Sequence, residues 1–197
     1  MGYLAKADAG DKLRLAPPAL SLGYVALTDI PISELALPYM QSLAARFHGG
    51  VSLGERDGVN IVYIQRCQGA SIIFSNFRVG SRVPMLLSAA GWAYLAGLPE
   101  SERAELLADL KKADPESFAK LQGPLHTAIA NYEQDGYLTS IGMMHPELNT
   151  VALPIRSSRN NRLYTISCGG IANVFTTEVL KEIGPELADL VHELSLV

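Results

Sequence analysis

Two short turns, each lying between segments with the pattern of β-strands, constrain the fold of this chain most strongly. Asp57-Gly58 separates an alternating segment that begins at Val51 from a strand expected at Val59 to Arg66, and an Asp-Gly pair is a strong hairpin signal. A Gln68-Gly69 turn then leads into a third expected strand, from about Ala70 to Val79. Because parallel strands need long crossover connections, these short turns predict three consecutive antiparallel strands.

A second group of strands is expected nearer the C-terminus. It comprises Tyr137 to Gly142, Leu148 to Arg156 and Leu163 to Gly169, and the polar residues Ser158 to Arg162 form a short turn between the last two. Helical patterns lie before, between and after the two groups. Hairpin-connected strands on either side of a helical insert predict one antiparallel sheet with helices packed on it, an α+β fold rather than a parallel doubly wound sheet.

The helices are predicted from the spacing of apolar residues. Pro38 is expected to split or kink the second helix, and Asp114 is placed to cap the fifth. The expected helices are Pro18 to Leu27, Ile32 to Phe47, Leu86 to Leu98, Glu100 to Lys112, Pro115 to Gln134 and Thr177 to Leu196.

Composition excludes several classes of protein. Of the 197 residues 48% are hydrophobic and two are cysteines, which fits a globular core and excludes disorder, collagen and a disulfide-stapled mini-fold. The 16 Lys and Arg against 20 Asp and Glu form no dense basic cluster, so these residues are not expected to bind nucleic acid. The longest uncharged run, Val83 to Pro99, is too short for a membrane span. No secretory signal is indicated, so we expect a cytoplasmic protein with reduced thiols.

Motifs for common catalytic chemistries are weak in this chain. The four histidines are scattered, and none has the spacing with a cysteine that prepares a metal site. Ser167 and Cys168 lack the GxSxG turn of a hydrolase nucleophile, and Gly169-Gly170 belongs to no phosphate-binding loop. Neither a metal nor a cofactor is therefore expected.

The most informative stretch runs from Gly80 to Ala96. A strand is expected to end at Gly80 and a loop to follow it, before a helix begins near Leu86 to Ala89 with small residues in its first turn. Accessible N–H groups at a helix N-terminus favour an anion, although the same small residues also allow close packing on a sheet. Thr150 and Ser167 would add hydroxyls from strands, and such neutral donors suit a small carboxylate.

Several segments share a recognisable order and spacing: Arg14 to Gly23, Gly80 to Ala96, Leu98 to Leu107, Asp135 to Tyr137, Val151 to Arg156 and Leu163 to Gly169. Together, over nearly the whole chain, they resemble the C-terminal effector-binding domain of IclR-family transcriptional regulators. The resemblance implies a GAF-like antiparallel sheet flanked by helices, in agreement with the α+β prediction from the hairpins.

The resemblance also implies an organisation. A winged helix-turn-helix domain precedes the effector-binding domain in this family, so residues 1–28 are expected to be a remnant of its wing and a linker helix, and residues 29–197 the effector-binding domain. Operator DNA would be contacted only through the absent N-terminal domain. Effectors of the family are mostly small organic acids and aromatic carboxylates. We therefore expect such a ligand here, together with a homodimer or homotetramer.

By position, the family's effector contacts correspond to residues on the third strand, the helix start and the C-terminal strands. Backbone N–H groups near Ala89 and Ala90, with Thr150 and Ser167, would hold a carboxylate. The full set is Ser75, Ala89, Ala90, Ser140, Leu148, Thr150, Ser167 and Gly169.

Two features depart from the family's pattern. Many members carry an acidic run shortly after the pair that is Gly136-Tyr137 here, whereas this chain has neutral and thioether residues from Leu138 to His145. Trp92 and Tyr94 stand where small or basic residues are common, which predicts an altered pocket mouth. We therefore expect an organic acid with an apolar or aromatic body rather than a highly hydroxylated ligand.

Two other functions remain open at this point. A thiol-dependent hydrolase or reductase would use Cys67 or Cys168, and it requires a thiolate of lowered pKa in an electropositive niche. Arg66 beside Cys67 is the local feature that favours it. A purely structural dimerisation module would have no pocket lined by the predicted site residues.

Overall fold

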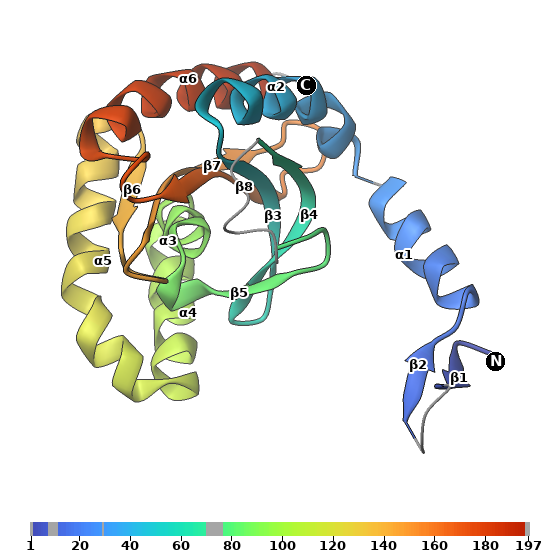
Figure 1. Cartoon of the computed structure of the whole chain (residues 1–197). Coiled ribbons are helices and arrows are strands. Elements are labelled where there is room, and N and C mark those ends of the chain that lie inside the picture. The colour runs from blue at the N-terminus through green and yellow to red at the C-terminus, as the bar shows by residue number, and fades with distance from the viewer. Residues whose placement is uncertain (1, 8–11, 29, 70–76, 196–197) are drawn as a thin grey trace.

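The computed structural model describes residues 2–7, 12–28, 30–69 and 77–195. Within these residues the main element is a six-stranded antiparallel sheet with the order β5-β4-β3-β8-β7-β6 (Figure 1). The strands are β3 (Gly50–Asp57), β4 (Asn60–Gln68), β5 (Arg82–Pro84), β6 (Leu138–Ile141), β7 (Leu148–Arg156) and β8 (Leu163–Ile171). This sheet, with helices on both faces, confirms the predicted α+β fold.

Two hairpins form the centre of the sheet, as the turn signals predict. Asp57 pairs with Asn60 across the first hairpin, and Gly58 in its loop has a φ of 61°, a conformation that favours glycine. In the second hairpin Arg156 pairs with Leu163. Strands β3 and β8 then pair with each other and join the two hairpins into one sheet.

The helices match most of the predicted ranges. Helix α2 continues through Pro38, so the expected split is not found. Asp114 caps α5, because its Oδ1 accepts the N–H of Ser117 at 3.0 Å. The helices are α1 (Pro18–Thr28), α2 (Pro31–Phe47), α3 (Ala89–Ala96), α4 (Glu100–Ala113), α5 (Pro115–Asp135) and α6 (Thr177–Ser195).

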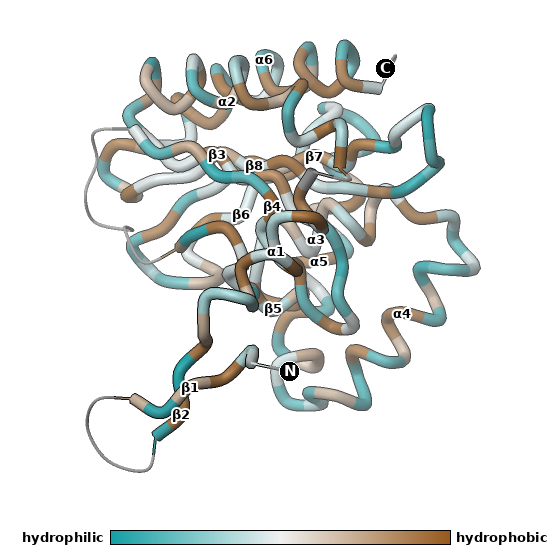
Figure 2. The backbone as a smooth tube through the Cα atoms, turned by 90° about the vertical axis from the view of Figure 1, so that its right-hand side faces the viewer, coloured by the Kyte–Doolittle hydropathy of each residue, from teal (hydrophilic) through white to brown (hydrophobic). Residues whose placement is uncertain are grey.

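The sheet separates two hydrophobic cores, because successive side chains of a strand point to opposite faces. Val51, Leu53 and Cys168 belong to the core under α2 and α6. Ile61 and Ala152 face the other way, into the core formed with α3, α4 and α5. In Figure 2 the strands accordingly lie between α2 and α6 on one side and α3 and α5 on the other.

In the middle of the chain, two predicted elements differ from the structure and one lies mostly outside the described residues. The residues through Pro84 are expected in a loop, but Arg82–Pro84 forms the edge strand β5, paired with β4 through Asn60, Ile61 and Val62. The predicted third strand falls mostly on residues 70–76, outside the described residues, and residues 77–79 are not in a strand. The helix expected from Leu86 begins at Ala89, after a 3-10 turn at Met85–Leu87, because Ser88 has extended backbone and caps α3.

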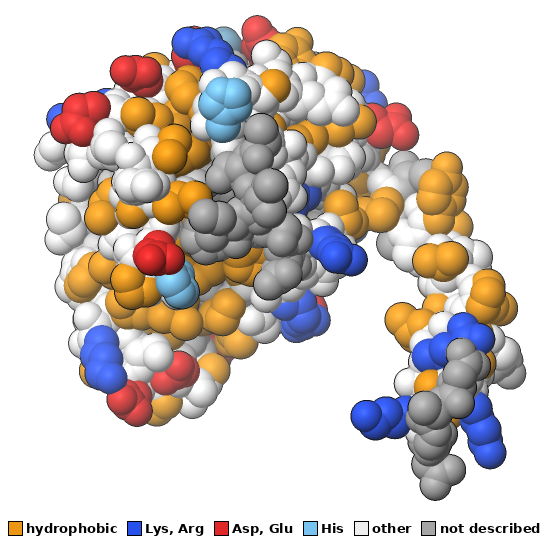
Figure 3. Space-filling view, viewed as in Figure 1, with side chains coloured by type: hydrophobic (Ala, Val, Ile, Leu, Met, Phe, Trp, Pro, Cys, Tyr) orange, Lys and Arg blue, Asp and Glu red, His pale blue; other side chains and the backbone are white. Residues whose placement is uncertain are grey.

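The N-terminal segment projects from the rest of the molecule (Figure 1). A two-stranded sheet of β1 (Leu4–Lys6) and β2 (Leu13–Leu15) leads into α1. Apolar side chains of α1 are exposed, including Leu20 at 75% and Tyr24 at 70%, and Figure 3 shows hydrophobic atoms on the protruding segment. None of the helices in the described residues is long and apolar enough to cross a membrane.

Candidate functional site

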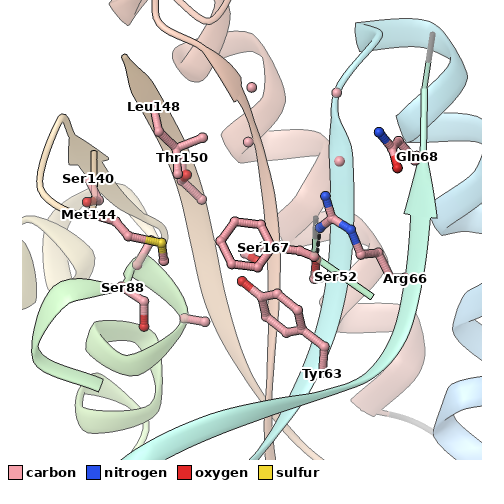
Figure 4. A pocket seen from close by; sticks show the side chains of 17 residues that line it. Ser52, Tyr63, Arg66, Gln68, Ser88, Ser140, Met144, Leu148, Thr150 and Ser167 are labelled. Carbon is pink, nitrogen blue, oxygen red and sulfur yellow. Dashed lines mark hydrogen bonds between the residues drawn. The ribbon is translucent and has the colours of Figure 1, made fainter. Parts of the chain in front are cut away.

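A pocket lies between one face of the sheet and the start of α3 (Figure 4). It has a volume of about 50 Å³. The structure brings seven of the eight residues predicted from the resemblance to its wall, and the eighth, Ser75, lies outside the described residues. The seven are Ala89, Ala90, Ser140, Leu148, Thr150, Ser167 and Gly169.

Arg66 is a lining residue that the sequence prediction of the site missed. Its Nη1 donates a hydrogen bond to Ser52 Oγ at 2.5 Å. Its Cζ lies 5.9 Å from the centre of the Tyr63 ring and 5.7 Å from that of Phe77, within range of a cation–π interaction. Figure 4 shows Arg66, Ser52 and Tyr63 on the side of the pocket opposite Ser88 and Met144.

No carboxylate of the described residues forms an ion pair with Arg66. Its Nε is buried and has no hydrogen-bond partner there. Burial lowers the pKa of the guanidinium, and weaker interactions with Tyr63, Cys67 and Cys168 oppose that shift. Arginine stays protonated in proteins, so the pocket contains a cation whose charge the described side chains do not neutralise.

Hydroxyl groups surround the same end of the pocket. Burial raises the pKa of Tyr63, while Arg66 and the hydroxyls of Ser52 and Ser167 lower it to a smaller extent. The phenol therefore keeps its proton at neutral pH and can donate a hydrogen bond. Thr150 adds a further hydroxyl from β7, on the side of the pocket near Leu148 (Figure 4).

A β-bulge explains why Tyr63 and Arg66 face the same pocket although they are three residues apart. Leu53 pairs with Gln65 and the next residue, Gly54, pairs with Tyr63, so Ile64 is the extra residue in β4. A bulge shifts the alternation of side chains by one position. Strict alternation would put Tyr63 and Arg66 on opposite faces, which is why the pattern of residues alone does not reveal this pair.

The opposite wall is formed by the start of α3 and by apolar side chains. Ser88 Oγ accepts the N–H of Gly91 at 3.1 Å, while Ala89 and Ala90 of the first turn line the pocket. A Cβ on Gly91 would lie 2.2 Å from the carbonyl oxygen of Met85. The small residues at the start of α3 therefore have both of the expected roles. Gly91 allows the helix to pack closely, and Ala89 and Ala90 leave backbone N–H groups beside the pocket.

The predicted departures from the family's pattern have different outcomes. Met144 lines the pocket, so a thioether group does occupy part of its wall. The expectation for Trp92 and Tyr94 is wrong, because neither lines this pocket. Trp92 is 2% exposed and its Nε1 donates to the carbonyl of Leu86 at 2.8 Å, so it stabilises the core, and Tyr94 borders a separate groove with Glu102.

The two cysteines lack the properties that a thiol-dependent enzyme needs. Both are buried free thiols. Burial raises the pKa of Cys168 to about 12, and it also raises the pKa of Cys67 although Arg66 opposes the shift. The enzyme alternative is therefore not supported. Within the part of the chain that the structure describes, no group of three metal-ligating side chains comes together.

Comparison with known proteins defines the class first: the domain is similar to the C-terminal domains of bacterial transcriptional regulators. The chain belongs to the IclR family, since residues 24–196 match the family model described as "Bacterial transcriptional regulator IclR C-terminal". The match covers every strand of the six-stranded sheet and all pocket residues.

Individual relatives agree with this assignment. The chain is 24% identical to the HTH-type transcriptional regulator TsaQ1/TsaQ2 of Comamonas testosteroni, over 98% of this chain and 71% of that protein. It is 26% identical to the Pca regulon regulatory protein of Pseudomonas putida, over 98% of this chain and 68% of that protein. The crystal structure of an IclR-family regulator from Brucella abortus is 32% identical, with a TM-score of 0.87 over 98% of this chain and 74% of that one. The crystal structure of Thermotoga maritima IclR shares the fold. It is 21% identical, with a TM-score of 0.77 over 98% of this chain and 78% of that one.

Proposed function

We propose that this domain senses a small organic acid and transmits its binding to DNA recognition by an IclR-family regulator. The observation that carries the proposal is the cation of Arg66, which faces a pocket and has no acidic partner among the described residues. Hydroxyls of Ser52, Thr150 and Ser167 accompany it. A cation with neutral donors in a pocket suits a carboxylate.

The remainder of the wall suits an apolar body. Met144 and Leu148 contribute apolar surface, and the N–H groups at Ala89 and Ala90 can bind a further oxygen of the ligand. A single water molecule needs about 10–15 Å³ of cavity volume. The pocket volume of about 50 Å³ therefore accommodates a molecule of roughly four non-hydrogen atoms, each about the size of a water. An aromatic acid, the larger ligand expected from the resemblance, requires the wall to move outward.

The N-terminal segment supplies the route to DNA in this proposal. Residues 1–28 would be the end of a winged helix-turn-helix domain and a linker helix, represented by the β1–β2 hairpin and α1, and residues 29–197 the effector-binding domain. The exposed Leu22, Tyr24 and Val25 of α1 favour burial against a second copy in a homodimer or homotetramer. Ligand binding would bias the position of α1 between two arrangements of the assembly.

A thermal-shift screen of organic acids against sugars tests the ligand class. Acids are expected to stabilise the domain and sugars to leave it unchanged; stabilisation by sugars alone would reject the proposal. Ser167→Phe fills the pocket and should abolish the shift, whereas Thr127→Phe, at an exposed position of α5, should keep it. Unchanged binding in Ser167→Phe would mean that the acids bind outside this pocket, as expected of a purely structural dimerisation module that has no ligand site here.

The coupling to DNA is tested with the full-length regulator. Effector affinity is measured with and without operator DNA, and an unequal affinity is expected because a ligand shifts an equilibrium only by its differential affinity for the two states. Equal affinities would refute the switch while leaving ligand binding intact.

A further inference from the structure

The guanidinium of Arg66 lies across the backbone of β3 at Gly50. A Cβ built on Gly50 would be 2.6 Å from Nη2 of Arg66 and 3.1 Å from its Cζ. Gly50 pairs with both neighbouring strands and has no positive φ, so its backbone conformation admits alanine. The absent side chain of Gly50 is therefore what gives the guanidinium its place beside the pocket.

Three other groups hold the guanidinium there. Ser52 accepts a hydrogen bond from Nη1, and the rings of Tyr63 and Phe77 lie close to the guanidinium carbon. The two rings contact each other edge to face, with centres 6.0 Å apart. A guanidinium fixed in this way loses little further freedom when it binds a planar carboxylate.

The start of α3, on the opposite wall, is a weaker site for a negative charge than Arg66. Ser88 accepts the N–H of Gly91 through its hydroxyl and that of Trp92 through its carbonyl. The helix terminus also carries only a partial charge, about half of an elementary charge, whereas Arg66 carries a full one. A carboxylate therefore gains more at the Arg66 end, and its apolar body then points toward Met144 and Leu148.

We infer that Arg66 recognises the carboxylate of the ligand, that Gly50 positions Arg66 by leaving it room, and that the acid is a short aliphatic one. This inference rests on the proposed function of the same pocket. It reverses the orientation expected from sequence, in which the carboxylate lies against Ala89 and Ala90. The size follows from the volume of about 50 Å³.

The experiment uses acetate, propionate and butyrate as probes, each paired with its uncharged amide, and benzoate with benzamide. Binding is measured by calorimetry and thermal shift for the wild-type chain, Arg66→Met and Gly50→Ala. Arg103→Met on α4 and Gly123→Ala, whose new Cβ meets no atom within 4 Å, are the matched controls. We expect short acids but not amides to bind the wild type, and Arg66→Met to weaken acid binding about 10- to 100-fold, as for loss of a hydrogen bond to a charged group.

Gly50→Ala should weaken acid binding at least about tenfold while Arg66 is still present, a factor worth about 1.4 kcal/mol. Its melting temperature should stay close to that of the wild type, because the three atoms nearest to the new methyl group all belong to the Arg66 guanidinium, which can shift away from β3 by giving up its place beside the pocket. Both controls should bind acids as the wild type does.

The outcomes separate the inference from the proposed function. Undiminished acid binding in Arg66→Met would overturn the inference and leave acid sensing in place, with the carboxylate at α3. Equal binding of acids and amides by the wild type would show that the charge is not recognised. Tighter binding of benzoate than of propionate would overturn the size limit. Failure of every acid to bind the wild type would count against the proposed function itself.

Discussion

The complete burial of the Cys168 thiol predicts that it reacts very slowly with alkylating reagents in the folded protein. Cys168 is 0% exposed on β8, and its pKa is raised from 9.0 to about 12. At pH 8 a thiol of pKa 12 is ionised in about one molecule in ten thousand, against about one in ten for a thiol of pKa 9. Because the thiolate is the reactive form, alkylation of Cys168 should be about 1,000-fold slower in the folded protein than in the unfolded chain.

The assay is alkylation by iodoacetamide at pH 8, with and without urea, followed by mass spectrometry of the peptides that carry each cysteine. Cys67, whose pKa is also raised by burial, should react slowly too in the folded protein. Rapid labelling of Cys168 in the folded protein would refute the argument from burial. It would also revive the thiol-dependent enzyme.

The same pKa shift makes stability depend on alkaline pH. The folded pKa lies above the unfolded one, so the contribution of Cys168 is present in full below pH 9. It is lost as the pH rises toward 12, because only the unfolded chain then releases the proton. Within that window the loss is about 1.4 kcal/mol per pH unit. Cys67 and Tyr63 act in the same direction.

Urea unfolding at pH 8, 9.5 and 10.5 isolates the contribution of Cys168 when the wild type is compared with Cys168→Ala. The free energy of unfolding should fall less steeply with pH in the variant. Equal slopes for the two proteins would contradict the assignment, whatever the absolute stability of the variant.

Three further predictions concern stability and are checked by urea unfolding. Leu187→Ala, at a fully buried position of α6, should cost about 2–5 kcal/mol, whereas Lys111→Ala, at an exposed position of α4, should change stability by no more than about 0.5 kcal/mol; similar losses would contradict the description of the core. Ser88→Ala should cost about 0.5–2 kcal/mol because it removes the cap of α3, and a neutral result would mean that the cap contributes nothing. Gly170→Ala places a Cβ 2.2 Å from the Phe175 ring and should cost about 1–3 kcal/mol. Gly23→Ala, whose new Cβ meets no atom within 4 Å, should not destabilise the protein. An unchanged stability of Gly170→Ala would show that Phe175 can move aside.

Local signals in the sequence are enough to predict the two hairpins and the antiparallel character of the sheet. The Asp57-Gly58 pair and the polar residues Ser158 to Arg162 both lie at tight connections, and such connections permit only antiparallel neighbours. The resemblance to a family then located seven of the 17 described residues that line the pocket. Thr150 and Ser167, on different strands, do face the same cavity.

The remaining features depend on interactions between distant residues. The extra residue at Ile64 is visible only once β4 is paired with β3. The sequence alone therefore identifies Arg66 as a neighbour of Cys67 but does not place it in the pocket. Arg82–Pro84 has no strand pattern of its own and becomes a strand by pairing with β4. The indole of Trp92 is buried by the turn that precedes α3, and this depends on how that turn folds back.

The alternation of side chains along β7 and β8 has a consequence for how such domains diverge. Thr150 and Ser167 face the pocket, and their neighbours Val151 and Cys168 belong to the core under α2 and α6. A new ligand preference therefore requires replacements only at every second position of these strands, and the intervening positions keep the helices packed on the sheet. Selection, or a protein engineer, can retune the signal that the domain detects without redesigning the scaffold that detects it.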